Sequence, residues 1–523
     1  MSVLLVLPLI IPLAAAVLAL LSSRTAAVQR AIAVGGAVAH AGSAAALLFL
    51  VLRHGVTAVQ AGGWPAPFGI TLVADITSAL LVLLTGVLGV AVTLSAVADV
   101  EAPAQRRAFF AVLQVLLMGV SGAFLTGDLF NLYVWFEVLL LASFVLLTLG
   151  GDRDRLRAGV HYVAVNLVGS TVFLIAAGLT YGTAQTLNFA DLALRLPALH
   201  TEHPRLVLVL AALFMLAFGL KAAMFPLGSW VPQSYPAPPA AVAAMFAGIL
   251  TKVGVYALLR ILTLCFPPLP TLQTFLLWLA GLTMVLGVIG AVAQVEMRRI
   301  LAFHSISQIG YMLLATALVV GAAPAARPVA VVALLVFMVH HGLVKSNLFL
   351  VSGAVGALRG TTRLEPLGGL ATAAPQLAML FFIAALSLAG LPPLSGFWAK
   401  LTVVQASFNA AQWPLAAAAL GTGLLTLLSM MKIWNEVFWK APPLDPAEPP
   451  RALPATRRGP IIGLVVLIVA VGLWPGPLLD LAGRAAEQLL TRQTYIDAVG
   501  LVRPFGANGA LGDGPPVVRE PPP

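Results

Sequence analysis

The sequence predicts an all-α integral membrane protein with about fourteen transmembrane helices. Of its 523 residues, 60% are hydrophobic and only 9% are charged, whereas an average soluble domain has about 25% charged residues. Apolar stretches longer than about 18 residues are typical of membrane-spanning helices, and here they follow one another along most of the chain. Residues 1–480 are therefore expected to form one polytopic membrane domain, followed by a polar tail at 481–523.

The apolar segments can be located one by one. They cover residues 3–21, 30–52, 72–97, 108–126, 129–149, 160–181, 206–230, 236–262, 273–293, 300–321, 328–355, 374–405, 411–435 and 461–480. The first has the length of a signal peptide. It lacks a basic n-region and a clear cleavage site, so it is predicted to be retained as the first helix.

Loop charges predict the orientation in the membrane. The loops after odd-numbered segments carry sixteen Lys and Arg residues, and the opposite loops carry five, namely Arg53, Arg195, Arg205, Arg260 and Arg327. Positive loops stay on the cytoplasmic side, so both termini are predicted to be periplasmic or extracellular, in a plasma (bacterial inner) membrane. Because the basic residues are spread over many short loops, the net charge of +10 indicates topology rather than nucleic-acid binding.

Segments seven and twelve contain similar interruptions. Pro226 in the seventh, and Pro392 with Pro393 in the twelfth, each begin a short run with Leu, Gly, Ser and then Trp. Proline inside a helix removes a hydrogen bond, and broken helices in matching positions are typical of inverted-repeat transporters. This pattern predicts two five-helix repeats, helices 4–8 (108–262) and 9–13 (273–435). Five is odd, so the repeats would be inverted; the alternative is two unrelated proline kinks.

Four of the six lysines lie inside apolar segments: Lys221, Lys252, Lys345 and Lys400. No arginine lies near the middle of such a segment. Lysine can release its proton when it is desolvated, whereas arginine effectively cannot. The choice of lysine therefore indicates that the chain handles protons.

Glu137 lies near the middle of segment five, where an isolated carboxylate costs several kcal/mol unless it is paired or protonated. Lys221 is the expected partner. Pairing favours both charged forms and separation favours the neutral ones, so a pair of variable distance could load and release protons. The alternative is a static ion pair that fixes helix packing.

The remaining candidates accompany the other lysines. Tyr256 follows Lys252 by one helical turn and could share a water chain with it. His341 lies one turn before Lys345, next to His340, and a buried imidazole can take up a proton on one nitrogen and release it from the other. Lys400 follows the second break, where a water-filled path is expected; the alternative is a lysine that snorkels towards a helix end.

Several polar residues are not expected to belong to a central relay. Asp75 and Asp128 are predicted helix caps, His304 a gate or a loop clasp, and His161 only marks the start of segment six. No metal is expected because no His, Cys or carboxylate cluster has zinc spacing. The single Cys265 excludes a cysteine-ligated cluster, no Walker A sequence is present, and no cofactor is expected.

The order and spacing of these motifs resemble the antiporter-like, proton-pumping subunits shared by respiratory complex I and the Mrp cation/proton antiporters. The resemblance runs from segment three to segment thirteen and is closest to the D-type subunits. It is carried by Gly127–Glu137, Lys221–Pro239, Thr251–Lys252, Ala302–Tyr311 and Gly390–Lys400.

The resemblance implies fourteen helices in two inverted repeats, with no redox chemistry in this subunit. It implies that Glu137 and Lys221 form the first pair, that Lys252 is the central relay, and that Lys400 is the terminal lysine. His341 and Lys345 match the family less well, and some complex I relatives have glutamate at the position of Lys400.

Three functions are consistent with the sequence. The leading hypothesis is a proton-translocating subunit, not itself an enzyme, that works with other membrane subunits to exchange H⁺ for a monovalent cation such as Na⁺. The first alternative is a pumping subunit of a redox complex, either complex I or a membrane-bound hydrogenase. The second is a structural scaffold that retains inherited charges.

Overall fold

The protein is described by a computed structural model that covers residues 2–100, 103–321, 323–441 and 453–501. It is almost entirely helical. The elements in chain order are α1 (Ser2–Leu21), α2 (Ala26–His54), β1 (Thr57–Gln60), η1 (Ala61–Gly63), β2 (Thr71–Ala74), α3 (Ile76–Asp99), α4 (Pro103–Leu125), α5 (Leu129–Thr148), α6 (Arg153–Ala184), α7 (Phe189–Glu202), α8 (Pro204–Ala222), η2 (Leu227–Ser229), α9 (Trp230–Ser234), α10 (Ala240–Met245), η3 (Phe246–Leu250), α11 (Thr251–Leu264), α12 (Pro270–Ala293), α13 (Met297–Val320), α14 (Ala326–Arg359), α15 (Leu370–Ala373), α16 (Pro375–Ala389), α17 (Ser395–Asn409), α18 (Trp413–Ile433), η4 (Trp434–Trp439), α19 (Ala455–Leu473), α20 (Gly476–Leu490) and α21 (Arg492–Val499).

Thirteen helical spans in the described ranges are long and apolar enough to cross a membrane. They correspond to all the predicted segments except 374–405. That segment consists of α16 and α17, which have 15 residues each and are too short to count separately. Counted together as one broken span, α16 and α17 bring the number to the fourteen spans that the sequence predicts.

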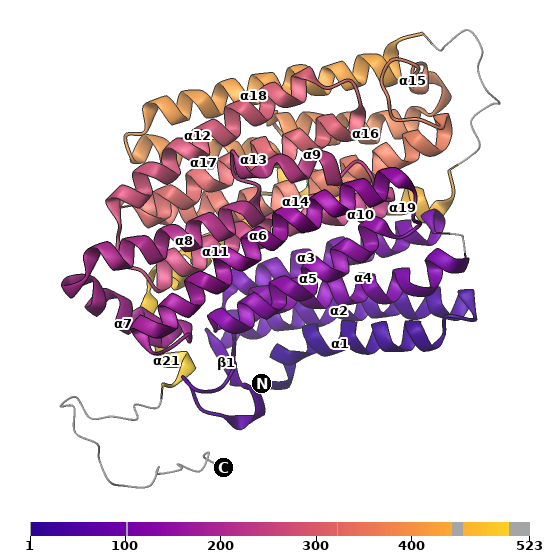
Figure 1. Cartoon of the computed structure of the whole chain (residues 1–523). Helices are drawn as coiled ribbons and strands as arrows, with labels where there is room; N and C mark the ends of the chain where they lie inside the picture. Colours follow the sequence, from indigo (N-terminus) through magenta and orange to yellow (C-terminus); the bar gives the residue numbers. More distant parts are fainter. Residues whose placement is uncertain (1, 101–102, 322, 442–452, 502–523) are drawn as a thin grey trace.

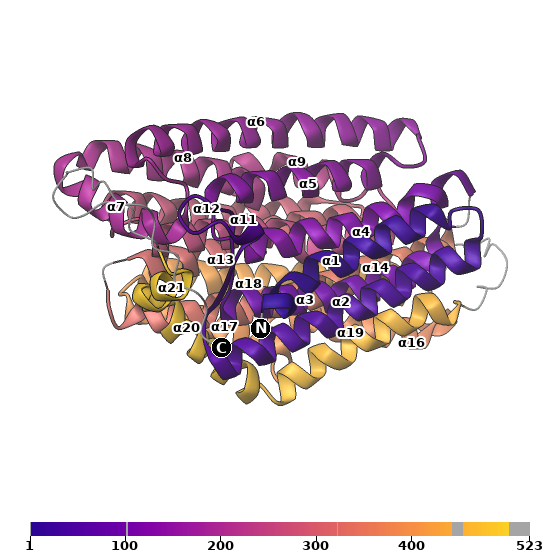
Figure 2. The same cartoon turned by 90° about the horizontal axis from the view of Figure 1, so that it is seen from below.

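The spans lie side by side in a broad bundle (Figure 1). The helices α1 to α5 form one end of it, and α12, α16, α17 and α18 form the other. Seen from below, α6 and α8 run along one edge and α16 and α19 along the opposite edge (Figure 2). The 34-residue α14 connects the two ends, because it contacts α3 and α10 as well as α13, α16, α17, α19 and α20.

One face of the bundle carries most of the structure outside the spans. There β1 pairs antiparallel with β2, from Thr57 opposite Ala74 to Gln60 opposite Thr71. The C-terminal α21 packs on β1 and α7, and α1 also contacts β1. The first and last described residues therefore lie on the same side of the bundle, which we term the terminal face.

The C-terminal region differs from the predicted polar tail. The last spanning helix, α19, ends at Leu473, and residues 476–499 form the two further helices α20 and α21. The apolar residues of α20 lie on one side of the helix, and Ala482, Ala485, Ala486 and Leu489 are buried. An amphipathic helix buries its apolar stripe against the bundle, so this part of the tail belongs to the fold. The Gly/Pro-rich end of the tail, at 502–523, lies outside the described residues.

Both predicted breaks are present. The helix α8 ends at Ala222 and α16 ends at Ala389, and each is followed by a residue in the left-handed conformation, Ala223 (φ 64°) and Gly390 (φ 95°). A left-handed residue after the last turn is a common way to end a helix. The inverted relation of the two five-helix repeats remains a prediction.

Candidate functional site

The helix α14 carries three fully buried titratable side chains, His340, His341 and Lys345. Residues 341 and 345 are one turn apart and share a face, as their spacing predicts. They lie on a helix that packs against α3 and α10 of the first half of the chain and against α13 and α17 of the second.

Lys221 lies in the last turn of α8 and is buried. Its Nζ donates to the backbone oxygen of Asn166 at 3.2 Å and to Ser170 Oγ at 3.0 Å. Both acceptors belong to α6. The Nζ also lies 5.6 Å from the centre of the Phe136 ring, so the lysine is held between α6 and α5.

Glu137 follows Phe136 on α5 and is half-buried. Its Oε1 atom is buried and has no hydrogen-bond partner among the described residues. The Lys221 Nζ donates to atoms of α6, and among the described residues no ion pair joins it to Glu137. The predicted Glu137–Lys221 pairing is thus not made in this conformation and remains a prediction.

Lys252 lies in the first turn of α11, directly after the π-helical turn η3. Its Nζ donates back to the carbonyl of Ala247 in that turn. The preceding helix α10 is fixed against α14, because Ser346 Oγ donates to the Ala244 carbonyl at 2.9 Å. π-Helical turns inside α-helices are frequent at functional sites.

His341 differs from the other buried lysines and histidines in its hydrogen bonding. Neither of its ring nitrogens has a hydrogen-bond partner in the described structure. Buried polar atoms are normally satisfied by protein or by ordered water. Lys345 lies one turn further along α14, on the same face as His341.

His340 connects α14 to the second break. Its Nδ1 is 2.9 Å from Ser395 Oγ, which is 3.1 Å from Ser387 Oγ. The two serines lie on either side of the break, on α17 and α16. The histidine therefore contacts the broken helix without touching Lys400.

Lys345 donates to the carbonyl of Leu301 on α13 at 2.5 Å. On the same helix, His304 Nε2 lies 2.5 Å from Ser429 Oγ of α18. His304 is fully buried and lies two turns inside α13, so the interpretation as a loop clasp is wrong. Through its contact with Ser429, His304 connects α13, which binds Lys345 of α14, to α18.

Lys400 lies within α17, and its Nζ donates to the carbonyl of Ala389 at 2.7 Å. Ala389 is the last residue of α16, so the lysine bonds back across the break rather than towards a helix end. Its Nζ is 5.3 Å from the centre of the Tyr311 ring. Both residues line a cavity of about 310 Å³ between α13, α16, α17 and α18.

The first break also adjoins a cavity, of about 470 Å³, but Lys221 does not line it. Its walls include Phe225, Pro226, Ser229, Gln233 and Arg299. The same kind of helix break thus stands beside a space at both positions, and only at the second does the lysine reach it.

Two expected roles need correction. Arg260 was expected in a loop, but it is buried in α11 and forms an ion pair with Asp75. Tyr256 donates to the Phe124 carbonyl at 2.7 Å and accepts from Arg260, so its hydroxyl is already engaged. Asp75 and Asp128 cap α3 and α5, which confirms both predicted caps.

The contacts of the lysines and histidines include residues that the sequence did not single out. These are Asn166, Ser170, Tyr311, Ser387, Ser395 and Ser429. Small polar residues are common in membrane helices, so nothing in their spacing distinguishes them. In the described ranges, no group of three or more His, Cys, Asp and Glu side chains is placed to hold a metal ion.

Comparisons with known proteins show which family the chain resembles. Residues 126–426 match the transmembrane family described as NADH:quinone oxidoreductase/Mrp antiporter. The D-type subunit of the Na⁺/H⁺ antiporter of Alkalihalophilus pseudofirmus is 40% identical over 500 residues, which cover 95% of this chain and 99% of the relative.

Solved structures show the same similarity. A chain of the Mrp complex from Dietzia sp. DQ12-45-1b superposes with a TM-score of 0.86 and 34% identity, covering 95% of this chain and 100% of that one. A chain of respiratory complex I from Thermus thermophilus superposes with a TM-score of 0.76 and 27% identity, covering 93% and 99%.

Proposed function

Because this chain belongs to the NADH:quinone oxidoreductase/Mrp antiporter transmembrane family, we propose that it is the proton-translocating, D-type subunit of a multisubunit Na⁺/H⁺ antiporter. The proposed cargo is H⁺ in exchange for a monovalent cation, with Na⁺ the first candidate. It acts as a transporter component and not as an enzyme. Its partners are other membrane subunits of the same complex.

The observation that carries the proposal is the series of buried lysines and histidines linked through α14. Lys252 follows a π-helical turn that packs against α14. His341 and Lys345 lie on α14, and Lys345 bonds to the helix that carries His304. Buried ionisable groups inside a membrane protein mark proton and ion pathways. A scaffold without transport would have no use for so many buried titratable groups.

In the proposed route, protons move across the bundle between Lys221 and Lys400. Lys252, His341 and Lys345 connect the two lysines at the ends, and His304 and His340 assist from either side. Glu137 is the counter-ion of Lys221 in a conformation where the two approach. The route includes a bridging water chain between these groups. The observation that supports it is that the buried His341 nitrogens have no protein partner among the described residues, because such buried groups are normally satisfied by water.

The same residues are consistent with a pumping subunit of a redox complex. The antiporter is favoured because the identity to the D-type antiporter subunit is 40%, against 27% for the complex I chain. We further infer that the protein lies in the plasma membrane with the terminal face outside. The positive-inside bias of the loops supports this orientation.

The test is Na⁺-dependent proton movement in everted vesicles that contain the whole complex. Replacing Lys221, Lys252 or Lys400 by Ala removes a proton carrier, and we expect activity to fall by about 10²-fold or more, as for other essential acid–base groups. Glu137→Ala should act in the same direction.

Lys432→Ala is the matched control, because this lysine only bonds the carbonyls of Val292 and Gln294 at a helix end. Assembly is checked by native electrophoresis. Undiminished antiport in the three lysine variants, with normal assembly, rejects the proposed route.

A further inference from the structure

The terminal-face end of α11 holds a buried polar cluster that the proton route does not use. It consists of Asp75, Tyr256, Arg260 and Tyr495, which we term the α11 cluster. Each of the four is at most 4% exposed. The residues come from α11 and α21 and from the N-cap of α3.

Arg260 contacts the other three members. It forms the ion pair with Asp75, and its Nε and Nη2 donate to Tyr256 Oη at 3.3 and 3.2 Å. Its guanidinium carbon lies 5.5 Å from the centre of the Tyr495 ring. Asp75 also accepts from the Ser78 backbone N–H at 2.8 Å.

The C-terminal helices cover this cluster. Gln488 of α20 accepts from the Ile76 N–H at 2.8 Å, directly beside Asp75. Arg492 of α21 donates to the Thr263 carbonyl at 2.7 Å, one turn beyond Arg260. Together these bonds hold Tyr495 over the end of α11.

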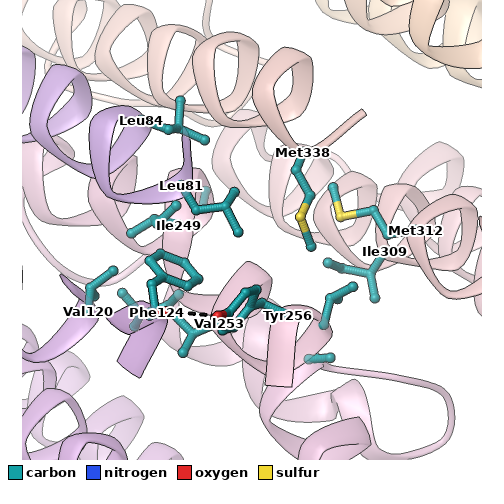
Figure 3. Packing of buried hydrophobic residues seen from close by; sticks show 14 of the residues in the cluster. Leu81, Leu84, Val120, Phe124, Ile249, Val253, Tyr256, Ile309, Met312 and Met338 are labelled. Carbon is teal, nitrogen blue, oxygen red and sulfur yellow. Dashed lines mark hydrogen bonds between the residues drawn. The ribbon is translucent and has the colours of Figure 1, made fainter. Parts of the chain in front are cut away.

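An apolar layer surrounds the Tyr256 ring. In Figure 3 the tyrosine ring lies among Leu81, Val120, Phe124 and Val253, and its hydroxyl points to the Phe124 backbone. Ile309, Met312 and Met338 close the other side. Lys252 and Arg260 are separated by two turns, or about 12 Å of helix rise.

Arg260 binds Tyr256 and Asp75, the two groups that could otherwise pass protons from Lys252 to the terminal face. Tyr256 has its proton committed to a carbonyl and its oxygen occupied by the guanidinium. Asp75 has its Oδ2 in the ion pair with Arg260 and its Oδ1 bonded to the Ser78 N–H. Arginine itself cannot release a proton in a protein.

We propose that Arg260 is a positioning residue that insulates Lys252 from the terminal face, so that protons pass sideways to α14 instead of leaking along α11. This inference rests on the proposed function, because it assumes that Lys252 carries protons. It also gives a reason for an arginine at this position in a chain that uses lysine at its other deep sites.

The decisive measurement is passive proton flux in proteoliposomes of the whole complex, driven by a valinomycin-mediated K⁺ diffusion potential in the absence of Na⁺. Arg260→Gln frees Tyr256 and Asp75, and proton flux is expected to rise several-fold above the wild-type level. Adding Lys252→Met to this variant should return the flux to wild type, since the leak would start from that lysine.

The Arg260→Lys variant distinguishes a role in insulating Lys252 from a role in packing alone. A lysine keeps the charge opposite Asp75, so a merely structural role would be rescued. Because lysine can release its proton, insulation would not be restored and the flux should remain above wild type. This variant also serves if Arg260→Gln fails to assemble.

The matched control is the second Asp–Arg pair of α3, at its other end. Arg457 of α19 donates to Asp99 Oδ1 at 3.1 and 2.6 Å. Arg457→Gln should leave the proton flux at the wild-type level. An assembled Arg260→Lys or Arg260→Gln variant with wild-type flux overturns the inference, whereas absent antiport in the wild type would reject the proposed function instead.

Discussion

The two broken helices end their first halves in the same way and hold their lysines differently. Lys221 precedes its break and bonds a neighbouring helix, through Asn166 and Ser170 of α6. Lys400 follows its break and bonds the carbonyl of Ala389, which belongs to the same broken segment. One lysine is therefore fixed by tertiary packing and the other by its own segment.

Their access to space also differs. The cavity of about 470 Å³ at the first break is lined by Phe225 and Pro226 but not by Lys221. The cavity of about 310 Å³ at the second break is lined by Lys400. We infer that Lys221 is an internal station, whereas Lys400 is the group at which the route exchanges protons, beside a space lined mainly by apolar side chains.

The largest effect is expected from Gly390→Ala at the second break. Gly390 has φ 95°, and an added Cβ would lie 2.7 Å from Lys400 Cδ. An L-residue with positive φ costs about 1–2 kcal/mol, and the lysine stem must also move. Antiport should be almost abolished, with a lower midpoint of thermal unfolding; wild-type antiport would show that the Lys400–Ala389 contact is dispensable.

The first break offers the reciprocal change, Ala223→Gly. Ala223 has φ 64° and is fully buried. Relief of the left-handed strain opposes the loss of a buried methyl group, so the free energy of unfolding should change by less than about 1 kcal/mol. Antiport should be retained, since this residue does not touch Lys221.

Filling the second cavity should restrict Lys400 together with the Ala389 carbonyl to which it donates. The Cβ of residue 423 would lie 3.5 Å from Lys400 Nζ, so Gly423→Leu places a side chain in the space that serves the lysine. Most of the antiport should be lost while assembly persists. Gly421→Leu is the control, because nothing lies within 4 Å of its added Cβ; equal effects of both changes would contradict the assigned exchange point.

A smaller effect is expected from Ser170→Ala, which removes one acceptor from Lys221. Hydrogen bonds between membrane helices contribute about 0.6 kcal/mol on average, so antiport should fall about threefold. Thr171→Ala is the control, since its exposed hydroxyl only bonds the Leu167 carbonyl. A loss as large as that of Lys221→Ala would mean that Ser170 itself carries protons.

Most of the fold was predictable from hydropathy, because each span repeats the same apolar signal. The exceptions have physical causes. The halves α16 and α17 are individually shorter than a membrane span, and α20 is amphipathic, so its sequence looks like a polar tail.

The candidate site was predictable only in part. A buried lysine is conspicuous in an apolar segment, and so Lys221, Lys252, Lys345 and Lys400 were found. Arg260 lies four residues from a helix end and looks like a loop charge, although packing of α3 and α21 buries it. Residues such as Ser170, which bind a lysine from a neighbouring helix, depend on how the helices pack. The periodicity of a single sequence does not show that packing.

The π-helical turn η3 (Phe246–Leu250) holds one residue more than an α-helix of the same path would need. Because the turn absorbs that residue, α11 beyond it keeps its phase, and Arg260 stays opposite Asp75. The Ala247 carbonyl inside the turn is the acceptor of Lys252 Nζ. Shortening the turn to a regular α-helix would therefore change the surroundings of Lys252 while leaving Arg260 in place.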